Sequence, residues 1–424
     1  METKRIIIED RNHIKDEELK EAARILRSGG LVAFPTETVY GLGGNALDED
    51  AARKIYAAKG RPSDNPLIAH VSCVEEVEPL VKEIPEAGRK LMEAFWPGPL
   101  TMIFPKSEKV PYGTTGGLDT VAIRMPDDPV ANRLIALAGV PVAAPSANTS
   151  GRPSPTTADH VWQDMNGRID MIIDGGPVGI GVESTIVDVS SAVPAVLRPG
   201  AITMEMLEEV LGEVSVDPAI LGPLSADVRP KAPGMKYKHY APKADLTLVE
   251  PGTGADRESG AEQVTGAEQK TGAGQKTGAE QKTGAEQVTG AEQKNGAGQK
   301  TGAEQKTGAD RNTGADPETG LDETQLQAMI CKVRELSREK IEAGYKVGVI
   351  CTDESRGCYT DGEVRSIGAR KSQASVAHNL YALLREFDDL GVDYIFSESF
   401  PKDHLGQAIM NRLSKAAGYK IVKV

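Results

Sequence analysis

The segment that most limits the fold of this chain is a run of six-residue repeats at 253–318. A typical copy, at 265–270, reads Thr-Gly-Ala-Glu-Gln-Lys. The glycine in each copy disfavours helix, and an occasional valine is the largest apolar side chain, so burial would not offset the loss of chain entropy. Repeat folds usually have periods of about 20 residues or more and an apolar face, which argues against a solenoid. We therefore expect 251–320 to be a disordered insertion, and the cores must form from the flanking residues.

Composition limits the class of protein. The chain of 424 residues is 39% hydrophobic, has no apolar stretch as long as a membrane span and begins without a signal-peptide core, which predicts a cytoplasmic protein with no membrane partner. Its four cysteines show no CxxC spacing, so a disulfide framework or zinc ribbon is disfavoured, and free thiols are favoured over a metal at Cys351 and Cys358. A net charge of −13 and 4% aromatic residues argue against a protein that coats nucleic acid, although a local basic groove stays open.

Apolar spacing predicts two α/β domains. Residues 1–212 alternate helices, such as 16–27 and 48–59, with short strands, which predicts a twisted, mixed sheet. A proline-rich linker at 213–243 follows, and 244–424 reads as a small doubly wound α/β domain with the repeat inserted after its first strand. The strands expected in the first domain are 30–34, 67–71, 100–104, 120–125, 140–144, 171–173, 184–189 and 195–197. The elements expected in the second are strands 244–250, 346–351 and 394–397, helices 323–343, 375–390 and 407–417, and a terminal strand.

Two segments concentrate polar side chains, 35–43 (PTETVYGLG) and 59–67 (KGRPSDNPL). The first follows the apolar run 30–34, so we expect its Thr, Glu and Gly residues to form the loop at the carboxyl end of that strand, where α/β proteins bind ligands. The second places Lys59 and Arg61 beyond a helix. These two cations could hold a phosphate or could only cap the carboxyl end of the helix.

Common nucleotide and hydrolase motifs are absent from the sequence: it has no GxxxxGK[ST], no complete GxGxxG, no HExxH and no GxSxG. Phosphates would therefore be held by scattered side chains. Besides Lys59 and Arg61, the candidates are Asn65, Arg198 after a strand, and the loop 144–151 (APSANTSG) with Ser154 close behind it. Such small polar residues also form simple turns.

A second group of candidates would suit a small zwitterion. Arg124 ends the strand at 120–125 and can form a forked ion pair with a carboxylate. Thr38, His70 and Ser184 also lie at strand ends, within polar reach of an amine or a hydroxyl. Each has a plainer reading, since His70 could be a packed strand-end residue and Glu183-Ser184-Thr185 could be strand-edge polarity.

Together with WPGPLT (96–101), VAIRMP (121–126), GVESTIVD (181–188), LRPG (197–200) and PGMKYKHYAP (233–242), these motifs resemble the threonylcarbamoyl-AMP synthase family, in its order, over nearly the whole chain outside the repeat. The late segment 404–413 (HLGQAIMNRL) agrees with it. The resemblance implies a YrdC-like catalytic domain followed by the small carboxyl-terminal domain of the family.

The resemblance also implies a nucleotidyltransferase that condenses L-threonine, bicarbonate and ATP into threonylcarbamoyl-AMP and pyrophosphate, for the t6A modification of tRNA at position 37. The product would pass to the tRNA threonylcarbamoyl transferase complex, and tRNA binding by this chain itself would be weak. By their match to the motifs, Lys59 and Arg61 are the expected catalytic residues. L-Threonine is assigned to Thr38, His70, Arg124 and Ser184. The residues assigned to ATP are Lys59, Arg61, Asn65, Thr120, Ala144 (through its backbone), Ser146, Asn148, Ser154, Arg198 and Tyr237.

Mg²⁺ is expected with the triphosphate, without a metal site built from protein side chains alone. The segment 233–242 is expected to close over the substrates, with Tyr237 on the nucleotide.

Three alternatives compete with this interpretation. YrdC-like domains resemble double-stranded-RNA binders, so the chain could be an RNA-binding or tRNA-binding module, which its acidic charge disfavours. A hydrogenase-maturation carbamoyl transferase would carry zinc-finger cysteines and an acylphosphatase-like domain, and the sequence has neither. A separate site at Asp353, Glu354 and Cys358 in the second domain is the third.

Overall fold

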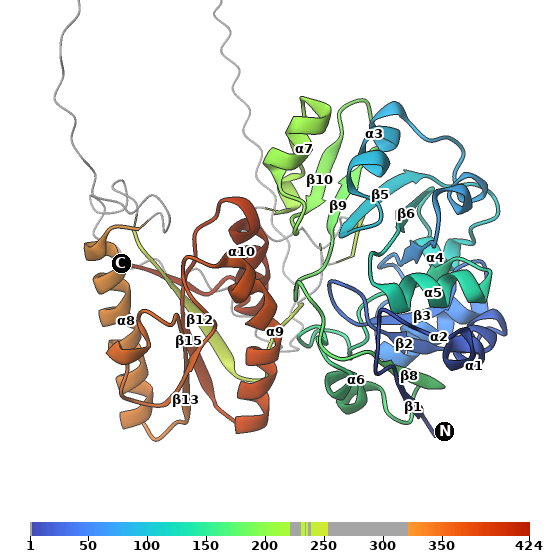
Figure 1. Ribbon diagram of the computed structural model, residues 1–424. Helices are drawn as coiled ribbons and strands as arrows, with labels where there is room; N and C mark the ends of the chain where they lie inside the picture. Colours follow the sequence, from blue (N-terminus) through green and yellow to red (C-terminus); the bar gives the residue numbers. More distant parts are fainter. Residues whose placement is uncertain (1, 221–229, 234, 236–238, 253–320) are drawn as a thin grey trace, which may run out of the picture.

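The computed structural model describes residues 2–220, 230–233, 235, 239–252 and 321–424. The described chain forms two sheets in two domains that lie side by side (Figure 1). The predicted disordered insertion at 251–320 falls almost wholly outside the described residues, and so does Tyr237. Among the described helices, none is long and apolar enough to cross a membrane.

The amino-terminal domain is built on an 11-stranded mixed sheet of order β1-β8-β2-β3-β7-β4-β6-β5-β9-β10-β11. Its strands are β1 (Lys4–Ile7), β2 (Val32–Phe34), β3 (Gly41–Asn45), β4 (Ile68–His70), β5 (Leu100–Pro105), β6 (Thr120–Arg124), β7 (Val142–Ala143), β8 (Met171–Asp174), β9 (Thr185–Asp188), β10 (Ala195–Arg198) and β11 (Ser215–Val216). Its helices are α1 (Asp16–Arg27), α2 (Glu49–Lys59), α3 (Glu86–Phe95), α4 (Tyr112–Thr115), α5 (Pro129–Ala138), α6 (Ala158–Met165) and α7 (Met204–Leu211), with short 3-10 turns at Val74–Glu76, Glu78–Leu80 and Pro218–Ile220.

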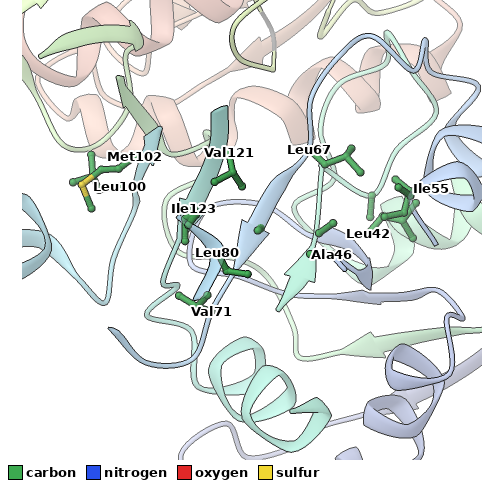
Figure 2. Packing of buried hydrophobic residues seen from close by; sticks show 14 of the residues in the cluster. Leu42, Ala46, Ile55, Leu67, Val71, Leu80, Leu100, Met102, Val121 and Ile123 are labelled. Atoms are coloured by element: carbon green, nitrogen blue, oxygen red, sulfur yellow. The ribbon is translucent and has the colours of Figure 1, made fainter. Parts of the chain in front are cut away.

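Both faces of this sheet are buried, as β8 illustrates. Met171 and Ile173 point into the core under α1 and α5, whereas Ile172 points into the larger core on the other face. Figure 2 shows part of that larger core, to which β3 contributes Leu42, α2 contributes Ile55 and β6 contributes Ile123. Alternating burial of this kind fixes the register of each strand, since a one-residue slip would exchange the two faces.

The predicted helices 16–27 and 48–59 are confirmed as α1 and α2, and Asp48 caps α2 by accepting a hydrogen bond from Asp50 N. One expectation is wrong. The motif 35–43 is a loop only as far as Tyr40, because β3 begins at Gly41 and pairs antiparallel with β2. The glycines that argued for a loop are required by close packing, since a Cβ on Gly43 would lie 2.7 Å from the Phe34 ring.

The carboxyl-terminal domain has a five-stranded parallel sheet of order β14-β13-β15-β12-β16. Helix α8 covers one face, and α9 and α10 cover the other (Figure 1). Its elements are β12 (Asp245–Glu250), α8 (Glu323–Glu342), β13 (Val347–Cys351), a 3-10 turn at Arg356–Cys358, β14 (Glu363–Ser366), α9 (Gln373–Leu390), β15 (Tyr394–Glu398), α10 (His404–Ala416) and β16 (Ile421–Lys423). This is the doubly wound pattern that the sequence predicts, with β14 as an added edge strand.

The two domains share a hydrophobic core. Val39 and Val182 of the first domain pack in one cluster with Val376 and Leu380 of α9 and Ile409 of α10. Helices α9 and α10 therefore also pack against two loops of the first domain, the loop that follows β2 and the loop that precedes β9. Those loops carry predicted substrate residues.

Candidate active site

A polar cavity lies where the loops of the first domain meet the segment that leads to the second. Ten of the predicted site residues line it: Thr38, Lys59, Arg61, His70, Arg124, Ala144, Ser146, Asn148, Ser184 and Arg198. Four of these are basic, and Glu183 is the acidic residue in the described lining, so the cavity favours anions. Its volume is ≈ 60 Å³.

Lys59 is the last residue of α2, but it does not cap that helix. Its side chain is buried, and Nζ donates to the backbone carbonyls of Ser146 and of Asn148, the latter at 2.7 Å. Burial, reinforced by repulsion from Arg61, holds the pKa of Lys59 well below its usual value. The lysine therefore connects α2 to the loop 144–151 and directs a poorly solvated amine toward the cavity.

Arg61 approaches the same cavity from the loop after α2. Its Nη2 donates to the carbonyl oxygens of Asn65 at 3.2 Å and Pro66 at 3.0 Å, and its Nε is buried without a hydrogen-bond partner. Burial lowers the pKa of Arg61 to about 10. The guanidinium is thus fixed on one edge and keeps donor capacity on another, as an anion-binding arginine requires.

Arg124 ends β6, and its guanidinium is held between two residues of the motif 35–43. Nη1 donates to Thr38 Oγ1 at 2.9 Å, and Nη2 lies 2.6 Å from Glu37 Oε1. Thr38 Oγ1 is also 2.9 Å from Thr36 Oγ1. This network fixes the orientation of the fork, which is the feature of arginine best suited to a carboxylate.

Ser184 and Arg198 form a second connected pair on the cavity wall. Arg198 donates from Nε to Ser184 O at 3.0 Å and from Nη2 to Ser184 Oγ at 3.1 Å. Ser184 Oγ also lies 2.8 Å from Thr101 Oγ1. Ser184, predicted to bind threonine, is therefore hydrogen-bonded directly to Arg198, predicted to bind ATP.

His70 ends β4, and its ring is buried. Nδ1 lies 3.1 Å from Ile68 O, so it is the donor in that contact. Burial, with repulsion from Arg124, lowers the pKa of His70 to about 3. His70 is therefore neutral at physiological pH in the substrate-free protein.

The loop 144–151 is pinned to the motif 35–43. Leu42 N donates to Pro145 O at 2.7 Å, and Ala147 N donates to Tyr40 O at 2.8 Å. Asn148 fixes its own loop by donating from Nδ2 to Arg152 O at 2.9 Å. These bonds place Ala144, Ser146 and Asn148 beside Lys59.

Three other predicted ATP residues do not line the cavity. Asn65 is buried behind Arg61 with an unpartnered Oδ1, and Ser154 is buried, with its Oγ 2.6 Å from Glu183 Oε1. Thr120 begins β6, whereas Arg124 ends that strand next to the cavity. Tyr237 lies outside the described residues.

Several lining residues were not among the predicted site residues, and they include Thr36, Glu183, Pro233, His239 and Tyr240. Glu183 could have been found from its place beside Ser184 in the motif 181–188. His239 and Tyr240 belong to the motif 233–242, so part of the segment expected to close over the substrates does line the cavity.

In the alternative site of the second domain, the two acidic side chains bond to residues of the same domain. Asp353 accepts a hydrogen bond from Ser366 Oγ, and the carboxylate of Glu354 accepts from Arg370 N at 2.9 Å. No group of three or more His, Cys, Asp or Glu side chains that could hold a metal occurs in the described part of the chain.

Comparison with known proteins identifies the family. A family model described as "Telomere recombination" matches residues 24–200, and one described as "Threonylcarbamoyl-AMP synthase, C-terminal domain" matches residues 202–418. The threonylcarbamoyl-AMP synthase of Pyrococcus abyssi is 43% identical over 419 residues, which cover 99% of both chains. This chain belongs to the threonylcarbamoyl-AMP synthase family.

Other relatives agree. The threonylcarbamoyl-AMP synthase of Bacillus subtilis is 41% identical over 426 residues, covering 100% of both chains. The crystal structure of P. abyssi Sua5 complexed with L-threonine aligns with a TM-score of 0.76 and 42% identity, over 99% of both chains. These findings confirm the predicted family, its α/β fold and the assignment of the chain as an enzyme, a transferase.

Proposed function

We propose that the cavity condenses L-threonine, bicarbonate and ATP into threonylcarbamoyl-AMP, pyrophosphate and water. One observation carries the proposal: Arg124, whose guanidinium is held in place by Thr38 and Glu37, lines the same small cavity as Lys59 and Arg61, which suit phosphates. A carboxylate site and a phosphate site that share one cavity fit a reaction between an amino acid derivative and a nucleotide.

In the proposed reaction Arg124 binds the threonine carboxylate, with Thr38, His70 and Ser184 around the amine and hydroxyl. The amine nitrogen forms a bond to the carbon of bicarbonate, and loss of water leaves a carbamate. A carbamate oxygen then attacks the α-phosphorus of ATP, and the bond from phosphorus to the bridging oxygen breaks to release pyrophosphate. None of these side chains forms a covalent bond, so positioning and neutralisation of charge supply the catalysis.

Lys59 and Arg61 act on the triphosphate in this scheme. Charge accumulates on the departing pyrophosphate. The negative triphosphate favours the protonated form of Lys59, and two desolvated cations at fixed positions then stabilise that charge more strongly than solvated ones would. The nucleotide would bind as MgATP, and the Mg²⁺ would supply further neutralisation of phosphate charge beside Lys59 and Arg61.

The segment 233–242 closes the site. Its described residues Pro233, His239 and Tyr240 line the cavity, which supports this role. Tyr237 is assigned to the nucleotide in the closed state.

After release, the product passes to the tRNA threonylcarbamoyl transferase complex for modification of position 37 of tRNA. The enzyme works in the cytoplasm.

The proposal is tested by incubating the purified chain with threonine, MgATP and ¹³C-bicarbonate and analysing the products by mass spectrometry. Threonylcarbamoyl-AMP carrying one ¹³C is expected. AMP or ADP as the sole nucleotide products would refute the proposal, and steeply salt-dependent tRNA binding without any product would favour an RNA-binding module.

A further inference from the structure

Two side chains of the carboxyl-terminal domain reach across the domain boundary to one carboxylate of the cavity wall. Tyr381 of α9 donates from its hydroxyl to Glu183 Oε2 at 2.9 Å, and Arg412 of α10 donates from Nε to the same oxygen at 3.1 Å. All three side chains are buried. We call Glu183, Tyr381 and Arg412 the interdomain triad.

The triad connects directly to residues assigned to the substrates. Ser154 Oγ donates to Glu183 Oε1 at 2.6 Å, and Ser184 is the next residue along the chain. Arg412 Nη1 also donates to Pro199 O at 2.6 Å, immediately after Arg198. The carboxyl-terminal domain thus holds three separate loops of the catalytic domain at the positions that carry Ser154, Ser184 and Arg198.

The charge of Glu183 stabilises the interdomain triad. Burial alone would raise the pKa of Glu183, but the charges of Arg412 and Arg198, together with the hydrogen bond from Ser154, outweigh it and hold that pKa below its usual value. Glu183 is therefore ionised at neutral pH and needs its donors. A buried carboxylate that loses a donor must shift or take up water, and either change displaces the loops attached to it.

The triad also contacts Tyr240, another residue that lines the cavity. The ring of Tyr381 stacks on Tyr240, with centroids 5.3 Å apart and an interplanar angle of 26°. The guanidinium carbon of Arg412 lies 5.9 Å from the centroid of the same Tyr240 ring. Helices α9 and α10 therefore touch both the fixed side of the cavity and its closing segment.

We propose that Tyr381 and Arg412 are positioning residues of the active site, which hold Glu183 so that Ser154, Ser184 and Arg198 meet ATP and threonine in the correct geometry. This inference rests on the proposed function of the cavity. It assigns the carboxyl-terminal domain a part in substrate binding, through residues that touch neither substrate.

The test compares two tyrosine-to-phenylalanine variants of the full-length enzyme. Tyr381→Phe removes the hydroxyl that donates to Glu183 but keeps the aromatic ring that stacks on Tyr240. Tyr359→Phe is the matched control, because its hydroxyl donates to another buried carboxylate, Glu398 Oε1, at 2.7 Å, within the second domain. Each variant loses the same kind of hydrogen bond, so a general loss of stability would affect both alike.

Tyr381→Phe is expected to raise the KM for ATP and the KM for threonine each by about tenfold, with a smaller change in kcat, because loss of a hydrogen bond to the charged Glu183 displaces the loops that carry Ser154 and Ser184 from the geometry that binds the substrates. Tyr359→Phe should leave both KM values within about twofold of wild type. Unchanged KM values in Tyr381→Phe, or equal effects in the two variants, would overturn the proposal. If Tyr381→Phe does not fold, Arg412→Lys, which keeps the charge but loses the guanidinium fork, makes the same prediction against the same control.

A failure of this inference is distinguishable from a failure of the proposed function. Wild-type enzyme that forms no threonylcarbamoyl-AMP would refute the function, whereas wild-type activity with an unaffected Tyr381→Phe variant would refute only the positioning role. A double-mutant cycle adds a second readout. Ser154→Ala and Tyr381→Phe should affect the KM for ATP non-additively, because both act through Glu183, and additive effects would contradict the proposal.

Discussion

Arg124 donates a hydrogen bond from Nη1 to the hydroxyl of Thr38 at 2.9 Å, across 86 residues of sequence. The contact joins the end of β6 to the loop after β2, and Glu37 fixes the other terminal nitrogen of the same guanidinium. The proposed carboxylate site is therefore assembled before threonine arrives, which lowers the ordering cost of binding.

Arg124→Lys should raise the KM for threonine by about 10²-fold and change the KM for ATP much less, because an ammonium cannot contact Thr38, Glu37 and a carboxylate with the geometry of a planar fork. Initial rates of product formation at varied threonine and saturating ATP measure this. A KM for threonine close to that of wild type would mean that Arg124 does not bind the carboxylate.

Lys59→Met should lower kcat/KM for ATP by about 10²–10³-fold, since the variant removes a preorganised charge from the proposed phosphate site. Lys54→Met is the matched control. Lys54 lies on the same helix and also donates to a backbone carbonyl, that of Gly29 at 2.6 Å, but it does not line the cavity. Similar losses in the two variants would show that the defect comes from α2 and not from the nucleotide site.

His70 should make the folded protein less stable in mild acid. The pKa of His70 is about 3 in the folded protein, whereas its ordinary value, expected in the unfolded chain, is 6.5. As the pH falls below 6.5, the unfolded chain therefore binds a proton at His70 and the folded chain does not. This one group should cost about 2 kcal/mol of unfolding free energy between pH 7 and pH 5. Urea unfolding at the two pH values measures the change. His70→Asn should show a correspondingly smaller decrease, and an identical decrease would contradict the assignment.

Gly181→Ala should weaken the contact between the domains. Gly181 has φ +91, and a Cβ there would lie 2.5 Å from the carbonyl oxygen of Ala377 on α9. Gly212 has φ +81, and a Cβ added there would meet no atom within 4 Å, so Gly212→Ala should cost only the backbone strain of about 1–2 kcal/mol.

Gly181→Ala should lower the free energy of unfolding by about 1–3 kcal/mol more than Gly212→Ala does, because overpacking at the domain interface is added to the backbone strain. The comparison is made by denaturant unfolding of both variants. Equal free energies would mean that α9 can move away from Gly181 without loss of packing.

Much of the fold follows from local patterns. Helix α2 has a capping aspartate, buried alanines on its inner face and a glycine at its end, so its limits are predictable from the sequence. Strand β3 could not be predicted in this way, because its glycines make local propensity unfavourable and only packing against Phe34 and Val142 explains them. Tertiary contacts decide such segments.

The candidate site divides similarly. Lys59 could be a phosphate ligand or a helix cap from its spacing alone, and the hydrogen bonds of its Nζ to the loop 144–151 exclude the cap. The part played by Arg412 and Tyr381 has no local signal at all, since their partner Glu183 lies 229 and 198 residues away in the chain. Contacts between two domains produce no periodic pattern in the sequence from which they could be predicted.

The most direct test of the central claim is the release of pyrophosphate from MgATP by the purified full-length enzyme, with threonine and bicarbonate omitted in turn. We predict release that requires both, with one pyrophosphate formed for each threonine consumed. Release that continues at the same rate without threonine would show that the cavity hydrolyses ATP and does not join it to an amino acid.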